Sequence, residues 1–367
     1  MKFGIANIFA LTVATSVSAF SPLSSNLIAS NKPSVGGRSS ISPLSAKPQR
    51  RKIERDWTYT DENGETYEAG GKLEVKVFLP DDGNVKGCVF FMHGFSQYTK
   101  AYQDTLEKVA NKANVAVISS ETGIVSGVVL GELLSDPLAM IKDRTRAQFV
   151  LQRALSEDTK QCINMVMKGD DVFKELNIGK NVPLGVSGHS MGGGLSFPVA
   201  ADCPKVNYVF TMAPVAGVPQ FNPIEQGVDM RTVNNSMLVA GTWDLIAKAD
   251  KIEDIYNKSN EKKKNSSTYV EIDRGLHTGF EDELVITKIS LDSILGKFLD
   301  LSCLSEKLLF SLIGFVRTNT GQLKGSEELM GFFFEKMVKG QKVTAQAADQ
   351  YLEENIKEKW DKKFTIV

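Results

Sequence analysis

The feature that most constrains the fold of this chain is a Gly-x-Ser-x-Gly turn at Gly188–Gly192, which reads GHSMG. A short apolar run, Val182–Val186, precedes it and predicts a buried strand, while helical spacing follows over Met191–Ala201. Such a sharp strand-to-helix turn has room only for small residues two positions to either side of the serine, and the two glycines meet that need. The pattern therefore predicts a strand–turn–helix unit that exposes the hydroxyl group of Ser190.

The rest of the chain alternates between predicted strands and predicted helices. Helical spacing at Tyr102–Ala113 and Arg144–Met167 separates short runs typical of strands. The expected strands are Leu73–Leu79, Cys88–Met92, Val115–Ser119, Val206–Met212, Met237–Ala240 and Ser267–Ile272. Strands joined through helices imply right-handed crossovers, so we expect an α/β fold with a mostly parallel central sheet and helices on both faces. Together with the serine turn, this order resembles the α/β-hydrolase fold.

The serine needs a base beside it, because a hydroxyl group is a weak nucleophile, and the chain has only three histidines. His189 lies inside the turn, so we expect its side chain to point away from Ser190. His93 precedes the serine, whereas the base of an α/β-hydrolase follows both the nucleophile and the acid. His277, just beyond the expected strand Ser267–Ile272, is therefore the predicted base.

The carboxylate that orients this base should follow a strand between the nucleophile and the base. Asp244 does so, since it comes three residues after Gly241, at the end of the run Met237–Ala240. Asp250 and Asp254 are alternatives, but they fall in a charged helical stretch whose usual role is a solvated face. We therefore predict Asp244 as the acid.

Two backbone N–H groups should stabilise the negative oxygen that forms during acyl transfer. In this fold one comes from the residue after the nucleophile, and the other from the loop after an earlier strand. That loop, His93–Phe95, follows the run Cys88–Met92. The predicted donors are therefore the N–H groups of Phe95 and Met191, and His93 is expected to hold the loop by hydrogen bonding.

The turn Gly188–Gly193, the loop His93–Phe95 and the strand end Gly241–Asp244 resemble the chlorophyllase, cutinase-like and dienelactone-hydrolase branch of the α/β-hydrolases. The resemblance spans roughly Lys72–Asp300. Dienelactone hydrolases usually carry cysteine as the nucleophile, so Ser190 favours the other two groups.

This resemblance implies a serine hydrolase that needs no cofactor or metal and acts on an ester with a large apolar part. Phe95 and Trp243 would flank the cleft as substrate-binding residues, although Trp243 is equally compatible with the core. The alternatives are an acyltransferase with the same triad and a non-catalytic lipid- or pigment-binding protein.

The N-terminal segment, residues 1–53, has the composition of a targeting sequence. An apolar stretch, Phe3–Val17, precedes small residues that suit cleavage after Ala19, which is the layout of a signal peptide. Serine- and proline-rich sequence without acidic residues then begins at Phe20, as in the bipartite plastid presequence of algae with secondary plastids. We expect a plastid address, with secretion as the alternative. A plastid address would suit chlorophyll or galactolipid esters as substrates.

Charge and cysteine content limit the remaining function classes. Residues 1–53 carry seven basic and no acidic residues, whereas the remainder carries 36 basic and 44 acidic residues, a net charge of −8. A protein this acidic is not expected to bind nucleic acid. The four cysteines are widely spaced and form no CxxC pair, so we expect no metal site and at most one disulfide.

Two segments have no counterpart in a minimal α/β-hydrolase. Gly123–Met140 is a weakly polar insert that could cap the cleft or belong to the core. The hydrolase domain is expected at residues 54–300, and residues 301–367 contain apolar residues at helical spacing. We predict a helical C-terminal extension packed on the domain. A lid, a dimer face and a membrane-surface contact are the alternatives.

Overall fold

The computed structural model describes residues 48–60, 64–95, 97–123, 128, 131, 135, 144–216, 222–229, 233, 235–260, 267–282, 319–356 and 363–367. All of these belong to one unit of the chain. Its centre is a sheet in which the described residues contribute nine strands. In order across the sheet these are β1 (Gln49–Glu54), β4 (Lys72–Phe78), β6 (Val115–Ser120), β5 (Gly87–Met92), β7 (Leu184–His189), β8 (Val206–Met212), β9 (Asn235–Gly241), β10 (Ser267–Ile272) and β11 (Phe364–Ile366).

The direction of the strands confirms the predicted mostly parallel sheet. The six strands from β6 to β10 run parallel to one another, whereas β1, β4 and β11 pair antiparallel with their neighbours. The central strands are buried along their whole length, which accounts for their continuous apolar sequences.

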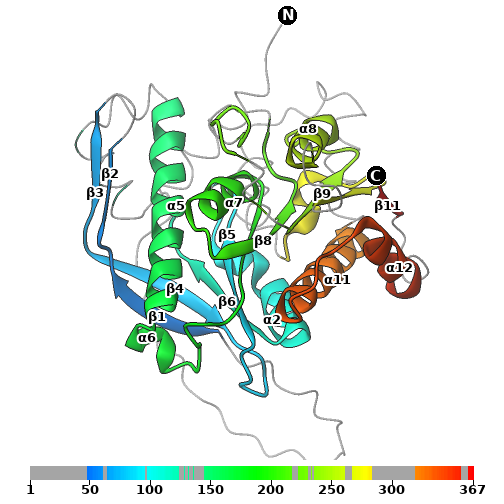
Figure 1. The fold of residues 1–367 in the computed structure, drawn as a ribbon. Coiled ribbons are helices and arrows are strands. Elements are labelled where there is room, and N and C mark those ends of the chain that lie inside the picture. The colour runs from blue at the N-terminus through cyan, green and yellow to red at the C-terminus, as the bar shows by residue number, and fades with distance from the viewer. Residues whose placement is uncertain are drawn as a thin grey trace, which may run out of the picture. The chain divides into compact units, whose positions relative to one another are not determined.

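Helices cover both faces of this sheet, as predicted (Figure 1). The connection from β5 to β6 contains α2 (Gln103–Ala113), and that from β6 to β7 contains α5 (Arg144–Lys168). These two connections cross the sheet in opposite directions, so right-handed crossovers place their helices on opposite faces. Helix α7 (Met191–Asp202) packs against α5, and α11 (Asn319–Val338) packs against α2. The carboxyl ends of β5 and β7 lie where the winding direction changes, which is where α/β sheets form their sites.

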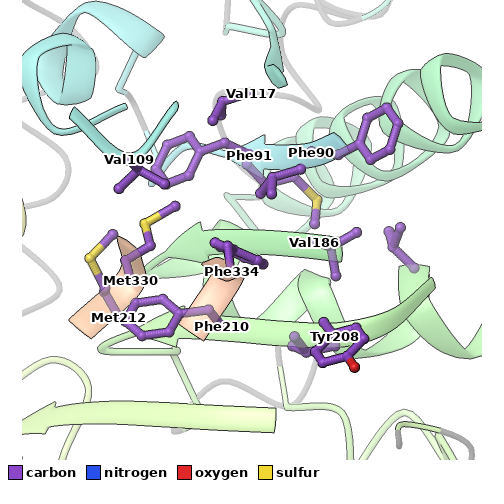
Figure 2. Packing of buried hydrophobic residues seen from close by; sticks show 14 of the residues in the cluster. Phe90, Phe91, Val109, Val117, Val186, Tyr208, Phe210, Met212, Met330 and Phe334 are labelled. Carbon is purple, nitrogen blue, oxygen red and sulfur yellow. The ribbon is translucent and has the colours of Figure 1, made fainter. Parts of the chain in front are cut away.

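The layers are joined by aromatic side chains on alternate sides of the central strands. Phe90 and Phe91 are adjacent in β5, so their rings point to opposite faces of the sheet. Figure 2 shows Phe91 beside Val109 of α2, and Phe334 of α11 close to Phe210 of β8. Because these side chains are almost fully buried, α11 belongs to the hydrophobic core of the sheet.

The C-terminal part is helical, as predicted, but it also completes the sheet. Strand β11 pairs antiparallel with β10 and forms one edge, and α12 (Ala345–Asn355) packs beside both strands. Ion pairs from Lys108 to Glu327, at 2.8 Å, and from Lys112 to Glu328 tie α11 to α2. The predicted boundary at residue 300 therefore does not separate two cores, because a late strand and helix share the core with the early ones.

The N-terminal boundary is a correction to the sequence analysis. Residues 49–53, assigned above to the targeting segment, belong to β1, which pairs with β4 at the other edge of the sheet. Only Ile53 of this strand is buried, so its basic, exposed sequence carried no strand signal. The folded part of the chain therefore begins earlier than predicted.

A buried ion pair fixes the segment that follows β1. Arg55 makes two hydrogen bonds of 2.9 Å to the carboxylate of Asp158 on α5. The same carboxylate accepts hydrogen bonds from the indole N–H of Trp57, at 2.8 Å, and from the hydroxyl of Thr122, at 2.6 Å. With four charge-assisted or polar contacts, this carboxylate is well compensated despite full burial. Trp57 opens a hairpin of β2 (Trp57–Thr60) and β3 (Thr66–Ala69).

The remaining described elements are short or peripheral. They are η1 (Thr99–Tyr102), α6 (Asp171–Lys174), α8 (Ala249–Asn260) and η4 (His277–Phe280). Cys88, Cys162 and Cys203 are buried free thiols. Among the helices described, none combines the length and the apolar sequence needed to cross a membrane. Residues 1–47, nearly all of the insert Gly123–Met140, and Cys303 lie outside the described residues.

Candidate active site

Ser190 occupies a strained turn between β7 and α7. Its φ of 57° and ψ of −120° are rare for a residue with a side chain. A Cβ on Gly188 would lie 2.4 Å from the backbone of Gly192, and a Cβ on Gly192 would lie 2.1 Å from the carbonyl oxygen of Met92. The turn can therefore close against β5 only with glycine at both positions. The N–H group of Ser190 donates to the carbonyl of Met212 at 3.0 Å, which holds the serine at the end of β7.

The structure brings Ser190, His277 and Asp244 into one chain of hydrogen bonds. His277 Nδ1 lies 2.7 Å from Asp244 Oδ2, and His277 Nε2 lies 2.8 Å from Ser190 Oγ. An ionised carboxylate can only accept, so Nδ1 of the neutral imidazole carries the proton. Nε2 is then the acceptor, and the serine hydroxyl donates to it. All three residues are at most 9% exposed.

The carboxylate of Asp244 is itself fixed by its own loop. Its Oδ1 atom accepts hydrogen bonds from the N–H groups of Ile246 and Ala247, both at 2.8 Å. One oxygen is thus held by the backbone, and the other faces the imidazole. The alternative acids, Asp250 and Asp254, lie exposed on α8, where Asp254 pairs with Lys251 at 3.2 Å.

Two glycines allow the loops that carry Asp244 and His277 to come into contact. The loop after β9, residues 242–247, is called the acid loop, and the loop after β10, residues 273–277, is called the base loop. A Cβ on Gly241, the last residue of β9, would lie 2.4 Å from the carbonyl oxygen of Gly275. That carbonyl accepts a hydrogen bond of 3.0 Å from the N–H group of Trp243. The backbones that carry the carboxylate and the imidazole are therefore locked together just before both side chains.

The loop after β5 lies directly against the serine. A Cβ on Gly94 would be 3.3 Å from Ser190 Cβ, so the loop predicted to supply an oxyanion donor lies next to Ser190. His93 Nδ1 lies 2.9 Å from the carbonyl of Gly94, which holds the loop by hydrogen bonding, as expected. Burial lowers the pKa of His93, so its imidazole is neutral. Phe95 is half-buried at the start of the next turn.

Met191 is the first residue of α7, and its side chain is buried. The first N–H groups of an α-helix have no acceptor within the helix, and the helix dipole adds positive potential there. The predicted second donor therefore sits where an anionic oxygen next to Ser190 would be favoured.

His189 points away from Ser190, as expected, and ties neighbouring loops together. Its Nε2 atom lies 2.9 Å from the carbonyl oxygen of His277, and its Nδ1 atom lies 2.7 Å from the hydroxyl of Tyr102. A carbonyl only accepts, so Nε2 carries the proton and the tyrosine donates to Nδ1. Burial, and then the neighbouring His277, lower the pKa of His189 well below its ordinary value, which keeps it neutral. The same tyrosine oxygen accepts from the N–H of Gly94 at 3.3 Å.

Sequence reasoning missed one polar contact to the base loop, from Gln322 of α11. Its Oε1 atom accepts from the N–H of Leu276 at 2.9 Å, and its Nε2 atom donates to the carbonyl of the same residue at 2.7 Å. A Cβ on Gly279 would lie 2.2 Å from the Gln322 amide oxygen, so the glycine makes room for it. Glycine at position 279 was the only local sign, and it did not identify a partner 43 residues away.

The acid loop also carries most of the exposed large apolar side chains of the described chain. Trp243, Leu245 and Ile246 are 59%, 71% and 38% exposed. The sequence left open whether Trp243 belongs to the core, and the structure places it at the surface. These side chains flank Asp244 on both sides.

Comparisons with known proteins find similar structures at low sequence identity. No family model matches the chain, and no curated protein matches it. The chain is similar to a dienelactone hydrolase from Anabaena variabilis, with 19% identity over 68% of this chain and 96% of that one, and a TM-score of 0.43. It is also similar to carboxyl esterase 2 of the fungus Tuber melanosporum, with 12% identity over 90% and 97% of the two chains, and a TM-score of 0.47.

A third similar structure is an esterase from Pyrobaculum calidifontis, with 14% identity over 62% of this chain and 76% of that one, and a TM-score of 0.42. The strand order, the crossovers and the serine turn themselves identify the fold as that of an α/β-hydrolase.

Proposed function

We propose that this protein is a serine carboxylic-ester hydrolase in which Ser190, His277 and Asp244 act as a catalytic triad. The observation that carries the proposal is the unbroken chain of hydrogen bonds from the serine hydroxyl to the carboxylate, at 2.8 and 2.7 Å. A strained turn that needs glycine on both sides presents the same serine. The structures of similar fold are named as esterases and a dienelactone hydrolase, which accords with the proposal without carrying it.

In the proposed reaction, Ser190 Oγ attacks the ester carbonyl while His277 Nε2 takes its proton. Asp244 stabilises the imidazolium that forms. The N–H groups of Phe95 and Met191 hold the oxyanion, and the imidazolium then protonates the departing alcohol. A water molecule, deprotonated by His277, attacks the acyl-enzyme and releases the acid. The same triad would serve an acyltransferase, in which an alcohol replaces this water molecule, and product analysis in the presence of an alcohol separates the two reactions.

The proposed substrate is an ester with a large apolar part, in the manner of the chlorophyllase and cutinase-like groups. Trp243, Leu245 and Ile246 support this, since they expose apolar surface on the loop that bears the acid. Phe95, half-buried and directly after Gly94 in the loop next to Ser190, would complete the apolar rim of the cleft. A plastid address on the N-terminal segment would make pigment or lipid esters accessible, and secretion is the alternative.

The mechanism is tested with a p-nitrophenyl ester and a fluorophosphonate that labels activated serines. The wild type should hydrolyse the ester and take up one label. Folded Ser190→Ala should lose both properties, whereas Ser196→Ala should keep both, because the Ser196 hydroxyl bonds only within α7. Near-wild-type turnover by folded Ser190→Ala would contradict the mechanism.

The substrate class is tested by measuring kcat/KM along a series from acetate through butyrate and octanoate to a phytyl ester. Each methylene group that the protein buries contributes about 0.8 kcal/mol, which is roughly a fourfold gain in kcat/KM. Trp243→Ala should flatten this gain. Val367→Ala, which removes another exposed apolar side chain, is the control and should not. A best rate on acetate, with no activity on the longer esters, would leave only a generic esterase.

A further inference from the structure

The base loop is held by its backbone as well as by the side chain of His277. Three polar groups of this backbone, the N–H and C=O of Leu276 and the C=O of His277, are bound by buried side chains. Gln322 of α11 binds the first two, and His189 of the serine turn binds the third. The loop thus receives fixed contacts from two elements that lie far from it in the sequence.

Gln322 is fully enclosed, and its helix cannot easily move. Its side chain is 1% exposed, and α11 packs against η4, which begins at His277. Phe333 and Phe334, one face of the same helix, are buried against the sheet. The amide of Gln322 therefore reaches the loop from a rigid support, which is what an accurately placed catalytic group requires.

The chemistry of the contact is specific to an amide. Leu276 offers one donor and one acceptor, and a glutamine amide is the side chain that supplies one of each in a single plane. The absence of a Cβ at Gly279 leaves the space that this amide fills. A carboxylate would lose the donor, and an apolar side chain would leave two backbone groups buried without a partner.

We propose that Gln322 is a positioning residue for the catalytic base, so that α11 acts on the reaction through Leu276. The proposal rests on the proposed triad. Its hydrogen bonds fix the residue directly before His277, and thereby the distance and angle between His277 Nε2 and Ser190 Oγ. His189, anchored by Tyr102, holds the carbonyl of His277 itself, which belongs to the next peptide. The C-terminal part of the chain would thus be needed for the turnover step as well as for the core.

The test compares Gln322→Met with Ser326→Ala. Methionine keeps the volume of glutamine but makes no hydrogen bond to Leu276. Ser326 lies one turn further along α11 and is equally buried, and its hydroxyl donates to the backbone carbonyl of Gln322, so its loss removes a polar contact at the same residue but leaves the Gln322 amide and its bonds to Leu276 in place. Gln322→Met should lower kcat by roughly 10- to 100-fold, the cost of a displacement of up to about 1 Å, while KM changes little. Ser326→Ala should leave both constants near wild type.

The Gln322→Glu variant should recover kcat/KM as the pH is lowered. A protonated carboxyl has both a donor and an acceptor and can replace the amide, whereas the carboxylate cannot. The ratio of the kcat/KM of Gln322→Glu to that of the wild type should therefore rise as the pH falls. A purely structural role would not change this ratio at pH values where both proteins are fully folded.

A readout without substrate separates failure of this proposal from failure of the proposed function. The chain has only three histidines, so the proton on His277 Nδ1, bonded to Asp244, can be assigned by NMR with single His→Gln variants. This proton should be shifted or broadened in Gln322→Met and unchanged in Ser326→Ala. An unchanged signal and unchanged kcat in folded Gln322→Met would overturn the proposal. So would equal losses in both variants. If the wild type hydrolyses no ester, the NMR comparison alone decides.

Discussion

Replacing Glu281 by glutamine should make the protein more stable, and the gain should depend on pH. Glu281 directly follows η4 and is 5% exposed. Its nearest ionisable neighbour of opposite type, His189, lies 3.9 Å away but is kept neutral by burial. Within the described part of the chain, Glu281 Oε2 has no hydrogen-bond partner. Burial, and then the charge of Asp282, therefore raise the pKa of Glu281 to about 8.

The sign and size of the effect follow from this raised pKa. Between its ordinary value of 4.5 and about 8, the carboxyl is ionised in the unfolded chain and protonated in the folded protein. Folding then takes up a proton, so stability falls as the pH rises through this window and reaches its lower limit above pH 8. At about 1.4 kcal/mol for each pKa unit, the loss at pH 9 is at most about 5 kcal/mol. Because glutamine cannot ionise, the Glu281→Gln variant avoids this loss of stability.

The measurement is urea denaturation of the wild type and Glu281→Gln at pH values from 5 to 9. The two free energies of unfolding should be similar at pH 5 and should then diverge in favour of the variant up to about pH 8. His189 and His93 are present in both proteins, and the pKa of Tyr102 lies well above its ordinary value of 10, so these groups contribute little to the difference between pH 5 and 9. The charge of Asp282 acts on Glu281 and is part of the measured effect. Parallel curves over the whole range would refute the reasoning, because they would show that Glu281 ionises alike in the folded and unfolded states.

Three further predictions concern the acid, the buried ion pair and the cell address. Asp244→Asn should lower kcat by about 10⁴, because the amide favours the wrong imidazole tautomer, while Asp250→Asn should have little effect; the reverse order in ester-hydrolysis assays would reassign the acid. Asp158→Ala should lower the free energy of unfolding by about 3–5 kcal/mol, since it leaves Arg55 charged and unpaired in the core, and a loss below about 1 kcal/mol in urea titrations would contradict this. A fusion of the N-terminal segment to a fluorescent protein should reach the plastid in a host with secondary plastids, and Phe20→Ala should divert it to secretion; plastid delivery unaffected by that change would argue against the bipartite signal.

Most of the sheet could be predicted because its central strands are buried on both faces. The runs at β5 and β6 are largely apolar, the short run Val182–Val186 leads into β7, and each is followed by helical spacing, so the order of elements was visible in the sequence. The edge strands β1 and β11 were not predicted. Strand β1 is mostly exposed and β11 has only three residues, and their pairing with β4 and β10 has no local signature.

The residues of the candidate site also fall into those that the sequence could predict and those that it could not. Gly188 and Gly192 are required by the turn itself, and the order of nucleophile, acid and base follows from the fold, so Ser190, Asp244 and His277 could be proposed from the sequence. The contact of Gln322 with Leu276 could not, because a side-chain amide that binds a distant backbone leaves no periodic pattern and no fixed spacing.

The sequence by itself therefore determined the alternation of elements, the strained serine turn and the residue types that chemistry requires at the strand ends. These features depend on steric limits within a few residues and on the burial of whole strands, and both can be recognised from a short stretch of sequence. Only the tertiary structure decided which polar groups meet across the core: Asp158 with Arg55, His189 with Tyr102, and Gln322 with the base loop. Such contacts form when burial forces each polar atom to find a partner, and the partner depends on how the whole chain packs.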